Sequence, residues 1–335
     1  HSSMNILITA AQGETFQRHF PAPILEQLRA LGTVVCNPFP RSFTAQELAE
    51  ALKDTDIVIT HWGTPQIDAC MLDGAPRLRL LAHAAGTVAH IASEAFYERN
   101  IPVLSANSVM ARFVAESVLG YMIAATHRVA QLNASIRAGS WDKRLGEQTS
   151  LFGNSIGLIG LGTVGRELLS LLAPFGCAVR VYDPYLPTGA LERWPFAAQC
   201  GFEEAMHQPI VSVHASQTPE TYHMIDANAL ELLPEGGILL NTARGSLVDT
   251  QALIAALQTR RIYAVLDVYE EEGAGNQPEA LLQCRENTLL LPHIAAAPAT
   301  WQLTQAVVDD IGRFLRGEPL TLAVSLRQYR LMTQE

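Results

Sequence analysis

The chain has 335 residues, 48% of them apolar, and a formal net charge of −10, a size and composition that suit two domains with their own cores. The negative charge argues against nucleic acid as a partner, because phosphate contacts need clustered lysine and arginine. No basic run or basic amphipathic stripe is present, so a membrane surface is not expected as a partner either.

The most apolar stretch, the cysteines and the first residues all indicate a cytoplasmic protein. Phe113–Ala130 contains Glu116 and Arg128, so it predicts a helix of a soluble protein and not a membrane span. The five cysteines are scattered, without a C-x-x-C pair, which is typical of reduced thiols. His1–Ser3, ahead of Met4, look like a remnant of an expression tag, and we expect no signal peptide before the first strand.

Short apolar runs alternate with helical stretches over the first hundred residues. Pro23–Leu31 is expected to be a helix, and Thr44 with Glu47 forms a capping box that predicts a second helix, through Lys53. Strands that alternate with helices of this length indicate a parallel sheet with helices on both faces. The expected strands are Asn5–Ala10, Thr33–Cys36, Ile57–Thr60, Leu78–Ala82 and Val103–Leu104.

A long helical region with room for a kink, Asn107–Gly139, and a polar loop, Ser140–Phe152, lead to a second alternating region that ends with a helix at Thr304–Arg316. The expected strands of this region are Ile156–Ile159, Val179–Tyr182, Ile210–His214, Gly237–Asn241, Ala264–Asp267 and Thr288–Leu291. We therefore predict two doubly wound parallel-sheet α/β domains, residues 4–106 plus 298–335 and residues 107–297, with a cleft between them.

A glycine-rich turn opens the second region. Gly160, Gly162 and Gly165 form G-x-G-x-x-G directly after a strand and before a helix. The first glycine permits a tight turn, the second lets a pyrophosphate approach the backbone, and the third allows close packing. The helix would direct its free N–H groups at that pyrophosphate. Asp183 ends the next strand, where a carboxylate accepts hydrogen bonds from a ribose. The stretch predicts a Rossmann dinucleotide-binding domain.

Three charged groups follow other strands of this region. Ligands of an open parallel sheet bind beyond the carboxyl ends of its strands, where we expect Arg244, Glu272 and His293, together with Asp267. Hydride transfer to a keto carbon needs a group that shuttles a proton, which suits histidine, and a cation that grips an anionic substrate, which suits arginine. A carboxylate bonded to the imidazole would orient the ring.

Each of these residues also has a purely structural interpretation. Arg244 could pair with Asp249, Glu270–Glu272 could be a solvated acidic run, and His293 could be a core histidine bonded to a carbonyl. All three at strand ends of one nucleotide-binding sheet favour the catalytic interpretation. The other histidines show no metal-ligand spacing, and we propose no metal.

Six motifs, in order, carry a family resemblance between about Asp56 and about Ile311: GLIGLGTVG, VYDP, HASQTPET, LLNTARGSLVD, LDVYEEE and LPHIA. With them the chain resembles the D-isomer-specific 2-hydroxyacid dehydrogenases, which include glycerate, phosphoglycerate and D-lactate dehydrogenases and glyoxylate reductases. The resemblance implies an NAD-dependent reductase of a small 2-keto acid that yields the D-2-hydroxy acid, with a flavodoxin-like substrate domain. The helix region at Asn107 and Ala115–Glu116 matches the family pattern too, which suggests a homodimer.

The resemblance also implies a role for each site residue. Arg244 would bind the substrate carboxylate and carbonyl, His293 would be the acid/base, and Glu272 its carboxylate partner. Asp267 would hold the nicotinamide amide, and Asp183 would favour NAD because a carboxylate repels a 2′-phosphate. The remaining cofactor contacts would come from the glycine turn and two strand ends: Gly160, Gly162, Thr163, Val164, Gly165, Ala215, Thr242 and Ala243.

The chain departs from the family pattern at several places. Thr163, Ser216 and Gly273 replace a common arginine and two common prolines, and the loop usually written A-G-x-G-x-D is here Ala85–His90. We expect the amides near Gly86, Thr87 and Val88 to bind the substrate carboxylate jointly with Arg244, with Gly86 permitting the turn.

In this loop we also expect the side chains of Thr87 and Val88 to narrow the pocket for acids such as glyoxylate or hydroxypyruvate. Two alternatives stay open at this point. One is a family member that acts on another anionic substrate, such as phosphite. The other is a non-catalytic, dinucleotide-sensing module of the corepressor kind, whose long extensions are not seen here.

Overall fold

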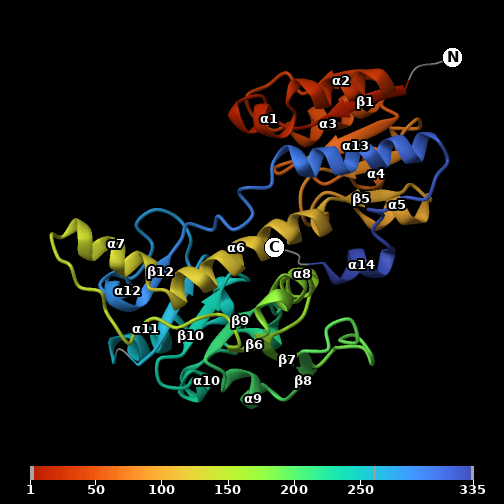
Figure 1. Ribbon diagram of the computed structural model, residues 1–335. Helices are drawn as coiled ribbons and strands as arrows, with labels where there is room; N and C mark the ends of the chain where they lie inside the picture. Colours follow the sequence, from red (N-terminus) through yellow and green to blue (C-terminus); the bar gives the residue numbers. More distant parts are fainter. Residues whose placement is uncertain (1–3, 260, 333–335) are drawn as a thin grey trace. The chain divides into compact units, whose positions relative to one another are not determined.

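The computed structural model describes residues 4–259 and 261–332, so the segment His1–Ser3, interpreted above as a tag remnant, lies outside the described residues. The chain forms two compact units. The first unit consists of the residues up to Met110 and those from Ala297 onward, and the second unit is Ala111–Ala296. Both are shown in Figure 1.

The first unit contains a parallel sheet of five strands. Their order across the sheet is β2-β1-β3-β4-β5, which is the doubly wound order of flavodoxin-like folds. Each neighbouring pair is parallel, so the carboxyl ends of all five strands lie at one edge. The strands are β1 (Met4–Ile8), β2 (Gly32–Cys36), β3 (Ile57–Thr60), β4 (Leu80–His83) and β5 (Val103–Ser105).

Helices cover both faces of this sheet. The capping box is confirmed, since the Thr44 hydroxyl accepts from the amide of Glu47 at the start of α3 (Ala45–Leu52). The other helices are α1 (Glu14–His19), α2 (Ala22–Leu31), α4 (Ala69–Asp73), α5 (Glu94–Glu98), α13 (Trp301–Leu315) and α14 (Leu326–Leu331). Leu7, Val58 and Leu81 pack against α3, α4, α5 and α14. The late helix α13 lies beside α2, where Gln27 and Gln305 exchange hydrogen bonds (Figure 1).

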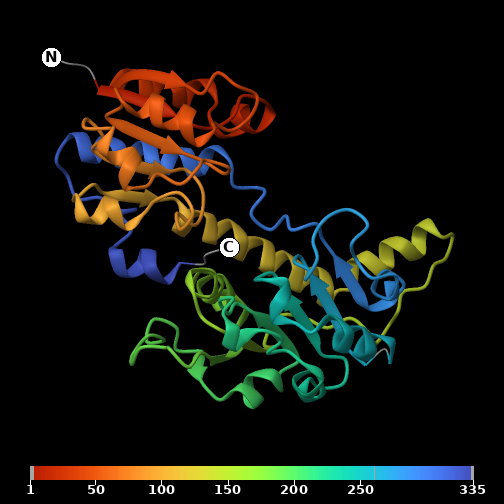
Figure 2. The same cartoon turned by 180° about the vertical axis from the view of Figure 1, so that it is seen from behind.

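The second unit contains a parallel sheet of seven strands in the order β12-β11-β10-β9-β6-β7-β8. Six of them have the order of the Rossmann fold, with β6 as the first strand and β12 added at the edge. The strands run from green to blue in Figure 2. They are β6 (Ser155–Ile159), β7 (Ala178–Tyr182), β8 (Ala197–Gln199), β9 (Ile210–Val213), β10 (Ile238–Asn241), β11 (Tyr263–Leu266) and β12 (Thr288–Leu290). The short strand β8 is absent from the sequence-based prediction.

Two apolar layers sandwich this sheet. Ile156, Leu158 and Val179 face one layer, which includes α6 and α8. Val211 and Leu239 face the other, which includes α9, α10, α11 and α12. The helices are α6 (Asn107–Thr126), α7 (Val129–Arg137), α8 (Thr163–Leu172), α9 (Phe202–Met206), α10 (Ala227–Leu232), α11 (Thr250–Gln258) and α12 (Glu279–Leu282), and the 3₁₀ turns are η1 (Ala173–Phe175), η2 (Pro219–Thr221), η3 (Gly245–Leu247) and η4 (Arg285–Asn287).

The predicted helical region Asn107–Gly139 is two helices, α6 and α7. Arg128 adopts a left-handed conformation, with φ of 55°, and this ends one helix before the next begins. Within the described residues, α6 alone is long and apolar enough to cross a membrane by length and composition. Its Ala115, Val118 and Met122 lie in the core of the second unit, as expected of a core helix.

Candidate active site

The glycine turn between β6 and α8 has the shape of a phosphate cradle. Gly160 has φ of 87°, and a Cβ there would lie 2.6 Å from the backbone of Ala215, so only glycine fits. Around Gly162 there is open space where a Cβ would point. It is the N-cap of α8, and no side chain caps the helix. The first amides of α8 are thus suited to donate hydrogen bonds to a bound anion.

The third glycine and the first helical residues complete this turn. A Cβ on Gly165 would lie 2.9 Å from the Leu161 side chain, so this glycine lets the helix pack on its own turn. Thr163 and Val164 are the first two residues of α8. The backbone of His214 lies against Gly160. Burial lowers the pKa of His214 to about 4, and its ring Nε2 lies 2.8 Å from the Ser212 hydroxyl.

Asp183 lies directly beside the glycine turn. It follows β7, and its Oδ2 accepts a hydrogen bond of 3.0 Å from the amide of Leu161, inside the turn. Its Oδ1 accepts one of 2.9 Å from the amide of Tyr185. A carboxylate offers about four acceptor positions, so both oxygens can still accept ribose hydroxyls. The acid and the turn therefore form one connected surface.

At the end of β10, Thr242 has an unsatisfied hydroxyl. The side chain is buried, and its Oγ1 has no hydrogen-bond partner among the described residues. A buried polar group in this condition calls for a ligand or a water. Together with the open space at Gly162, this hydroxyl fits a dinucleotide along these strand ends. The Thr242–Ala243 segment is where the nicotinamide side is expected.

Arg244 lies two residues after Thr242. Its Nη1 donates to the carbonyl of Ala243 at 2.8 Å, and its own carbonyl accepts from the Asn241 amide group at 3.0 Å. The buried Asn241 side chain also accepts from the amide of Ala243. The turn that carries Arg244 is therefore fixed to the end of its strand.

His293 and Glu272 form a pair in the same unit. The His293 Nδ1 lies 2.9 Å from the Glu272 Oε2, and both side chains are about half exposed. His293 has φ of 52°, a conformation that is unusual for a residue other than glycine and is common at functional sites. Because Glu272 occupies Nδ1, Nε2 is the ring nitrogen that remains available for another hydrogen bond.

Four contacts hold the segment around His293. The buried Asp267 carboxylate accepts from the amides of Ile294, at 2.8 Å, and Ala295, at 3.0 Å. The Tyr269 hydroxyl donates to the carbonyl of Leu291, and burial raises the pKa of Tyr269 to about 12. A hydroxyl of α6, on Ser117, donates to the carbonyl of Ala295. No sequence pattern predicts this anchoring role of Asp267.

In the first unit, the loop Ala85–His90 follows β4. Gly86 is not among the positive-φ glycines, and its constraint is space, since a Cβ would lie 3.3 Å from the Met110 Sδ. The expectation that the Val88 side chain narrows a substrate pocket is wrong. That side chain is fully buried in the core of the first unit, which leaves only its backbone for a ligand. The Thr87 hydroxyl accepts from the amide of Ala89 at 3.2 Å.

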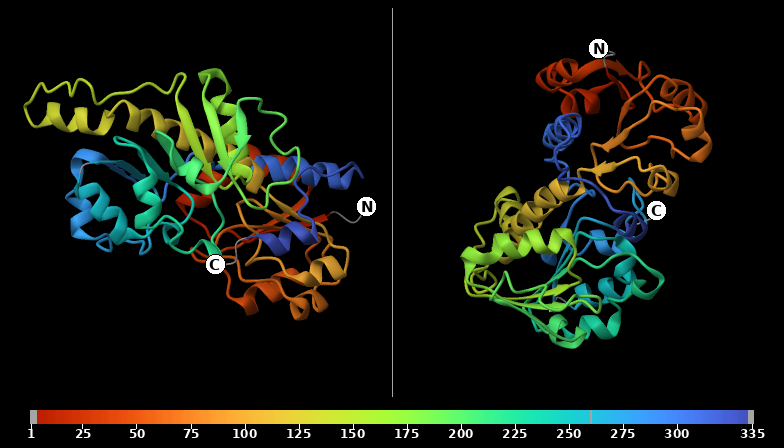
Figure 3. Two further views of the ribbon diagram at one scale, coloured as in Figure 1. Left: turned by 90° about the horizontal axis from the view of Figure 1, so that it is seen from below. Right: turned by 90° about the vertical axis from the view of Figure 1, so that its right-hand side faces the viewer.

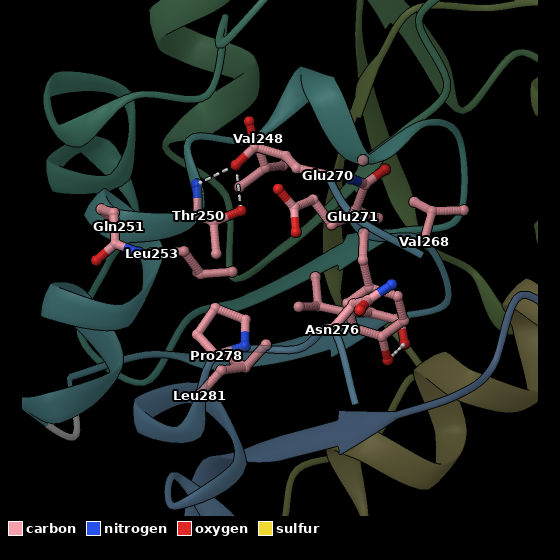
Figure 4. A pocket seen from close by; sticks show the side chains of 14 residues that line it. Val248, Thr250, Gln251, Leu253, Val268, Glu270, Glu271, Asn276, Pro278 and Leu281 are labelled. Atoms are coloured by element: carbon pink, nitrogen blue, oxygen red, sulfur yellow. Dashed lines mark hydrogen bonds between the residues drawn. The ribbon is translucent and has the colours of Figure 1, made fainter. Parts of the chain in front are cut away.

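A pocket of about 250 Å³ lies next to the Arg244 turn, in the second unit. It is shown in Figure 4. Its floor consists of aliphatic side chains that include Leu253, Leu266 and Leu281, and Glu270 and Glu271 line it as well. The side chains of Glu270 and His223 form a hydrogen bond near this pocket. Nothing in the sequence pattern had singled out His223. Among the described residues, no group of three or more acidic, histidine or cysteine side chains could hold a metal ion.

Comparison with known proteins gives a consistent result. The family model for the NAD binding domain of D-isomer specific 2-hydroxyacid dehydrogenases matches residues 119–295. The chain is 32% identical to D-3-phosphoglycerate dehydrogenase of Methanocaldococcus jannaschii over 82% of this chain and 52% of that protein. It is 31% identical to glyoxylate reductase of Thermofilum pendens over 90% of this chain and 91% of the relative.

A solved structure from Thermus thermophilus has 28% identity and a TM-score of 0.73, covering 96% of this chain and all of the other. The chain spans about half the length of the phosphoglycerate dehydrogenases that it matches. The matched domain, the glycine turn with its adjacent acid and the ordered motifs agree with one another. The chain therefore belongs to the D-isomer specific 2-hydroxyacid dehydrogenase family, and its second unit is that family's NAD-binding domain.

Proposed function

We propose that this protein is an NAD-dependent oxidoreductase that interconverts a small 2-keto acid and its D-2-hydroxy acid. The observation that carries the proposal is the His293–Glu272 pair, 2.9 Å apart, in the unit that also contains the glycine turn and Arg244. The names of the relatives support the substrate class, since two of them are a hydroxypyruvate reductase and a glyoxylate reductase.

The proposed roles follow from the donors and acceptors at each position. NADH, when bound, supplies the hydride that reduces the keto carbon. Arg244 holds the substrate carboxylate and polarises the keto oxygen with its planar fork of N–H groups. His293 donates a proton from Nε2 to the oxygen that becomes the hydroxyl. Glu272 bonds to Nδ1, orients the ring and stabilises its protonated form. In the reverse reaction His293 removes that proton.

For the cofactor, we propose that the glycine turn binds the pyrophosphate and Asp183 the ribose. Gly160, Gly162, Thr163, Val164 and Gly165 would form the turn, with Ala215 against it. Thr242 would use its unsatisfied hydroxyl on the nicotinamide side, next to Ala243. Asp267 already accepts two backbone amides, and its remaining acceptor positions would take the nicotinamide amide group.

A panel of 2-keto acids assayed with NADH tests the proposal directly. We expect turnover of glyoxylate or hydroxypyruvate, with the D-2-hydroxy acid as product, identified by chiral chromatography. Larger branched or aromatic keto acids should react more slowly. If no 2-keto acid is reduced while NADH binds, the proposed reaction is wrong and a sensing role for the dinucleotide becomes the better interpretation.

NADH should be used with a kcat/KM at least about tenfold higher than NADPH, because the Asp183 carboxylate accepts ribose hydroxyls and repels a 2′-phosphate. Asp183→Asn keeps an acceptor for the amide of Leu161 and removes the charge, so it should reduce the preference for NADH over NADPH. Glu192→Gln, which removes an exposed charge from the same loop between β7 and β8, is the matched control. Equal use of NADPH by the unchanged protein would refute this role.

Gly86→Val should raise KM for the keto acid about tenfold or more, because backbone amides of Gly86–Val88 hold the carboxylate and the new side chain must displace Met110. NADH affinity should stay within about twofold, since the turn that binds it belongs to the other unit. Gly74→Val, at the end of α4 where a Cβ meets only ordinary contacts, is the control for the loss of a glycine. An unchanged KM in Gly86→Val would exclude the loop from substrate binding.

We also propose that the protein is a cytoplasmic homodimer, with small acids as its other partners. Helix α7 begins against the edge of its sheet, where Gln131 donates to the carbonyl of Thr288, and its far end projects beyond the sheet (Figure 3). Val129, Ile136, Trp141 and Leu145 are exposed there, the last two by 78% and 83%. Apolar side chains gathered on one projection favour contact with a protein surface, and a second copy of this chain is the proposed occupant. Light scattering of the protein in solution would measure its mass.

A further inference from the structure

One hydrogen-bonded cluster joins three segments of the second unit. The Glu270 carboxylate accepts from the amide of Thr250 at 3.1 Å and from the Thr250 hydroxyl. Its other oxygen is bonded to the Nε2 of His223. We call Glu270, His223 and Thr250 the clamp. Figure 4 shows Glu270 reaching toward Thr250, with two dashed bonds between them.

The clamp joins the segment that contains Arg244 to the segment that contains Glu272. Glu270 is two residues before Glu272, and Thr250 is six residues after Arg244. The segment that contains His223 is bonded through its backbone to the segment that contains Arg244 and Thr250, because the amide of His223 donates to the carbonyl of Ser246 at 2.8 Å. The amide of Ile225 donates in the same way to the carbonyl of Leu247.

The segments also touch directly next to Arg244. A Cβ on Gly245 would lie 2.0 Å from the carbonyl carbon of Tyr269, so the residue after Arg244 rests on the backbone just before Glu270. Farther along, the two segments border the pocket of about 250 Å³. Thr250 and Glu270 both line this pocket, so their hydrogen bonds join the two segments beside it.

The charge state of Glu270 agrees with this arrangement. Burial by itself would raise the pKa of Glu270, but the hydrogen bonds from Thr250 and His223 outweigh it and hold the pKa below its ordinary value. The carboxylate is therefore ionised at neutral pH, where charge-assisted hydrogen bonds are stronger than neutral ones. His223 itself has φ of 50°, and its ring stacks on Tyr222 with centroids 3.9 Å apart.

We propose that Glu270 and His223 are positioning residues that, through Thr250, hold the segment bearing Arg244 in register with the segment bearing Glu272. They touch neither the substrate nor the cofactor. Their effect is to keep the guanidinium and the His293–Glu272 pair at the separation that a small keto acid requires. The expected change in KM and kcat rests on the proposed function. The expected change in the mobility of the segment that contains Arg244 rests on the hydrogen bonds alone.

Glu270→Ala is the main test, with Glu271→Gln as the matched control because it removes a charge from the same segment outside the clamp. At a temperature well below unfolding, Glu270→Ala should raise KM for the keto acid and lower kcat, together reducing kcat/KM about ten- to a hundredfold. NADH affinity should not change. Thr250→Val should show part of this loss, and Thr250→Ser, which keeps the hydroxyl, should recover it.

A double substitution shows whether Glu270 and His223 act as one unit or contribute independently. Glu270→Ala with His223→Ala should be little worse than Glu270→Ala alone, because the two residues act as one unit. Effects that multiply would overturn the proposal, as would kinetics of Glu270→Ala equal to those of Glu271→Gln. If Glu270→Ala fails to fold, the contrast between Thr250→Val and Thr250→Ser decides, and equal kinetics in that pair overturn the proposal.

Hydrogen exchange provides a readout that does not depend on turnover. In Glu270→Ala, amides of residues 244–250 should exchange faster, while those of the glycine turn at 160–165 should not. Unchanged exchange at 244–250 would overturn the inference even in an active enzyme. Failure of the proposed function looks different, since the unchanged protein would then reduce no 2-keto acid while the exchange contrast between Glu270→Ala and Glu271→Gln remained.

Discussion

His293→Ala is expected to lower kcat for the keto acid by about 10²–10⁴-fold, the range typical of losing a general acid. In the native protein Nδ1 is bonded to Glu272, which leaves Nε2 for the proposed proton transfer. NADH binding should hardly change, because His293 follows β12 at one edge of the sheet, and β11, β10 and β9 separate that strand from β6 and its glycine turn. Steady-state kinetics with a fluorescence titration of NADH would measure both.

Two further variants show whether the proton or the ring's packing matters. His293→Asn keeps a donor near Glu272 but has no group to protonate at Nε2, so it should be as slow as His293→Ala. Added imidazole should partly restore the turnover of His293→Ala.

Glu272→Gln should shift the pH–rate profile, because the imidazolium loses its charged partner. His127→Ala, at an exposed position, is the control, and near-normal turnover of His293→Ala would exclude His293 as the proton donor.

Acid is expected to destabilise the first unit well before its carboxylates are protonated. His61 and His83 are 3% and 1% exposed. Burial, together with the nearby His19 and His83, lowers the pKa of His61 to about 3. Burial lowers the pKa of His83 to about 4. The ring of His61 contacts His19, with Nε2 3.2 Å from its Nδ1, and His83 bonds to the Thr60 hydroxyl at 2.8 Å.

The direction follows from where each state binds protons. In the unfolded chain a histidine titrates near pH 6.5, whereas the folded rings stay neutral down to about pH 4. Below pH 6.5 the unfolded state therefore binds more protons, and the free energy of unfolding falls as the pH falls. Between pH 6.5 and pH 5 the two histidines together should remove on the order of 3 kcal/mol. That is a large part of a typical 5–15 kcal/mol.

Urea unfolding followed by circular dichroism at pH 6.5 and pH 5 would measure this loss. His83→Gln cannot take up a proton in either state, so the loss between the two pH values should shrink to about half. His127→Gln, at an exposed position, should show the full loss. A free energy of unfolding that is equal at both pH values in the unchanged protein would contradict the prediction.

The strands other than β8, the glycine turn and the family could be predicted from the sequence because their signals are local or ordered along the chain. Buried parallel strands appear as short apolar runs, and the turn needs glycine where φ is positive, as at Gly160. The residues proposed for catalysis follow strands, and all strands of a parallel sheet end at one edge. That topology makes Arg244 and His293 candidates from the sequence alone.

The sequence alone determined the two α/β sheets, the dinucleotide turn with Asp183, and the candidates Arg244, Glu272 and His293. Only the tertiary structure decided that Val88 faces the core, that Asp267 anchors the segment after His293, and that Glu270 reaches His223 across 47 positions of the chain. These contacts join residues remote in sequence, and no local pattern encodes them. Side-chain direction in a loop depends on which neighbours fill the space, which is settled only when the whole chain packs.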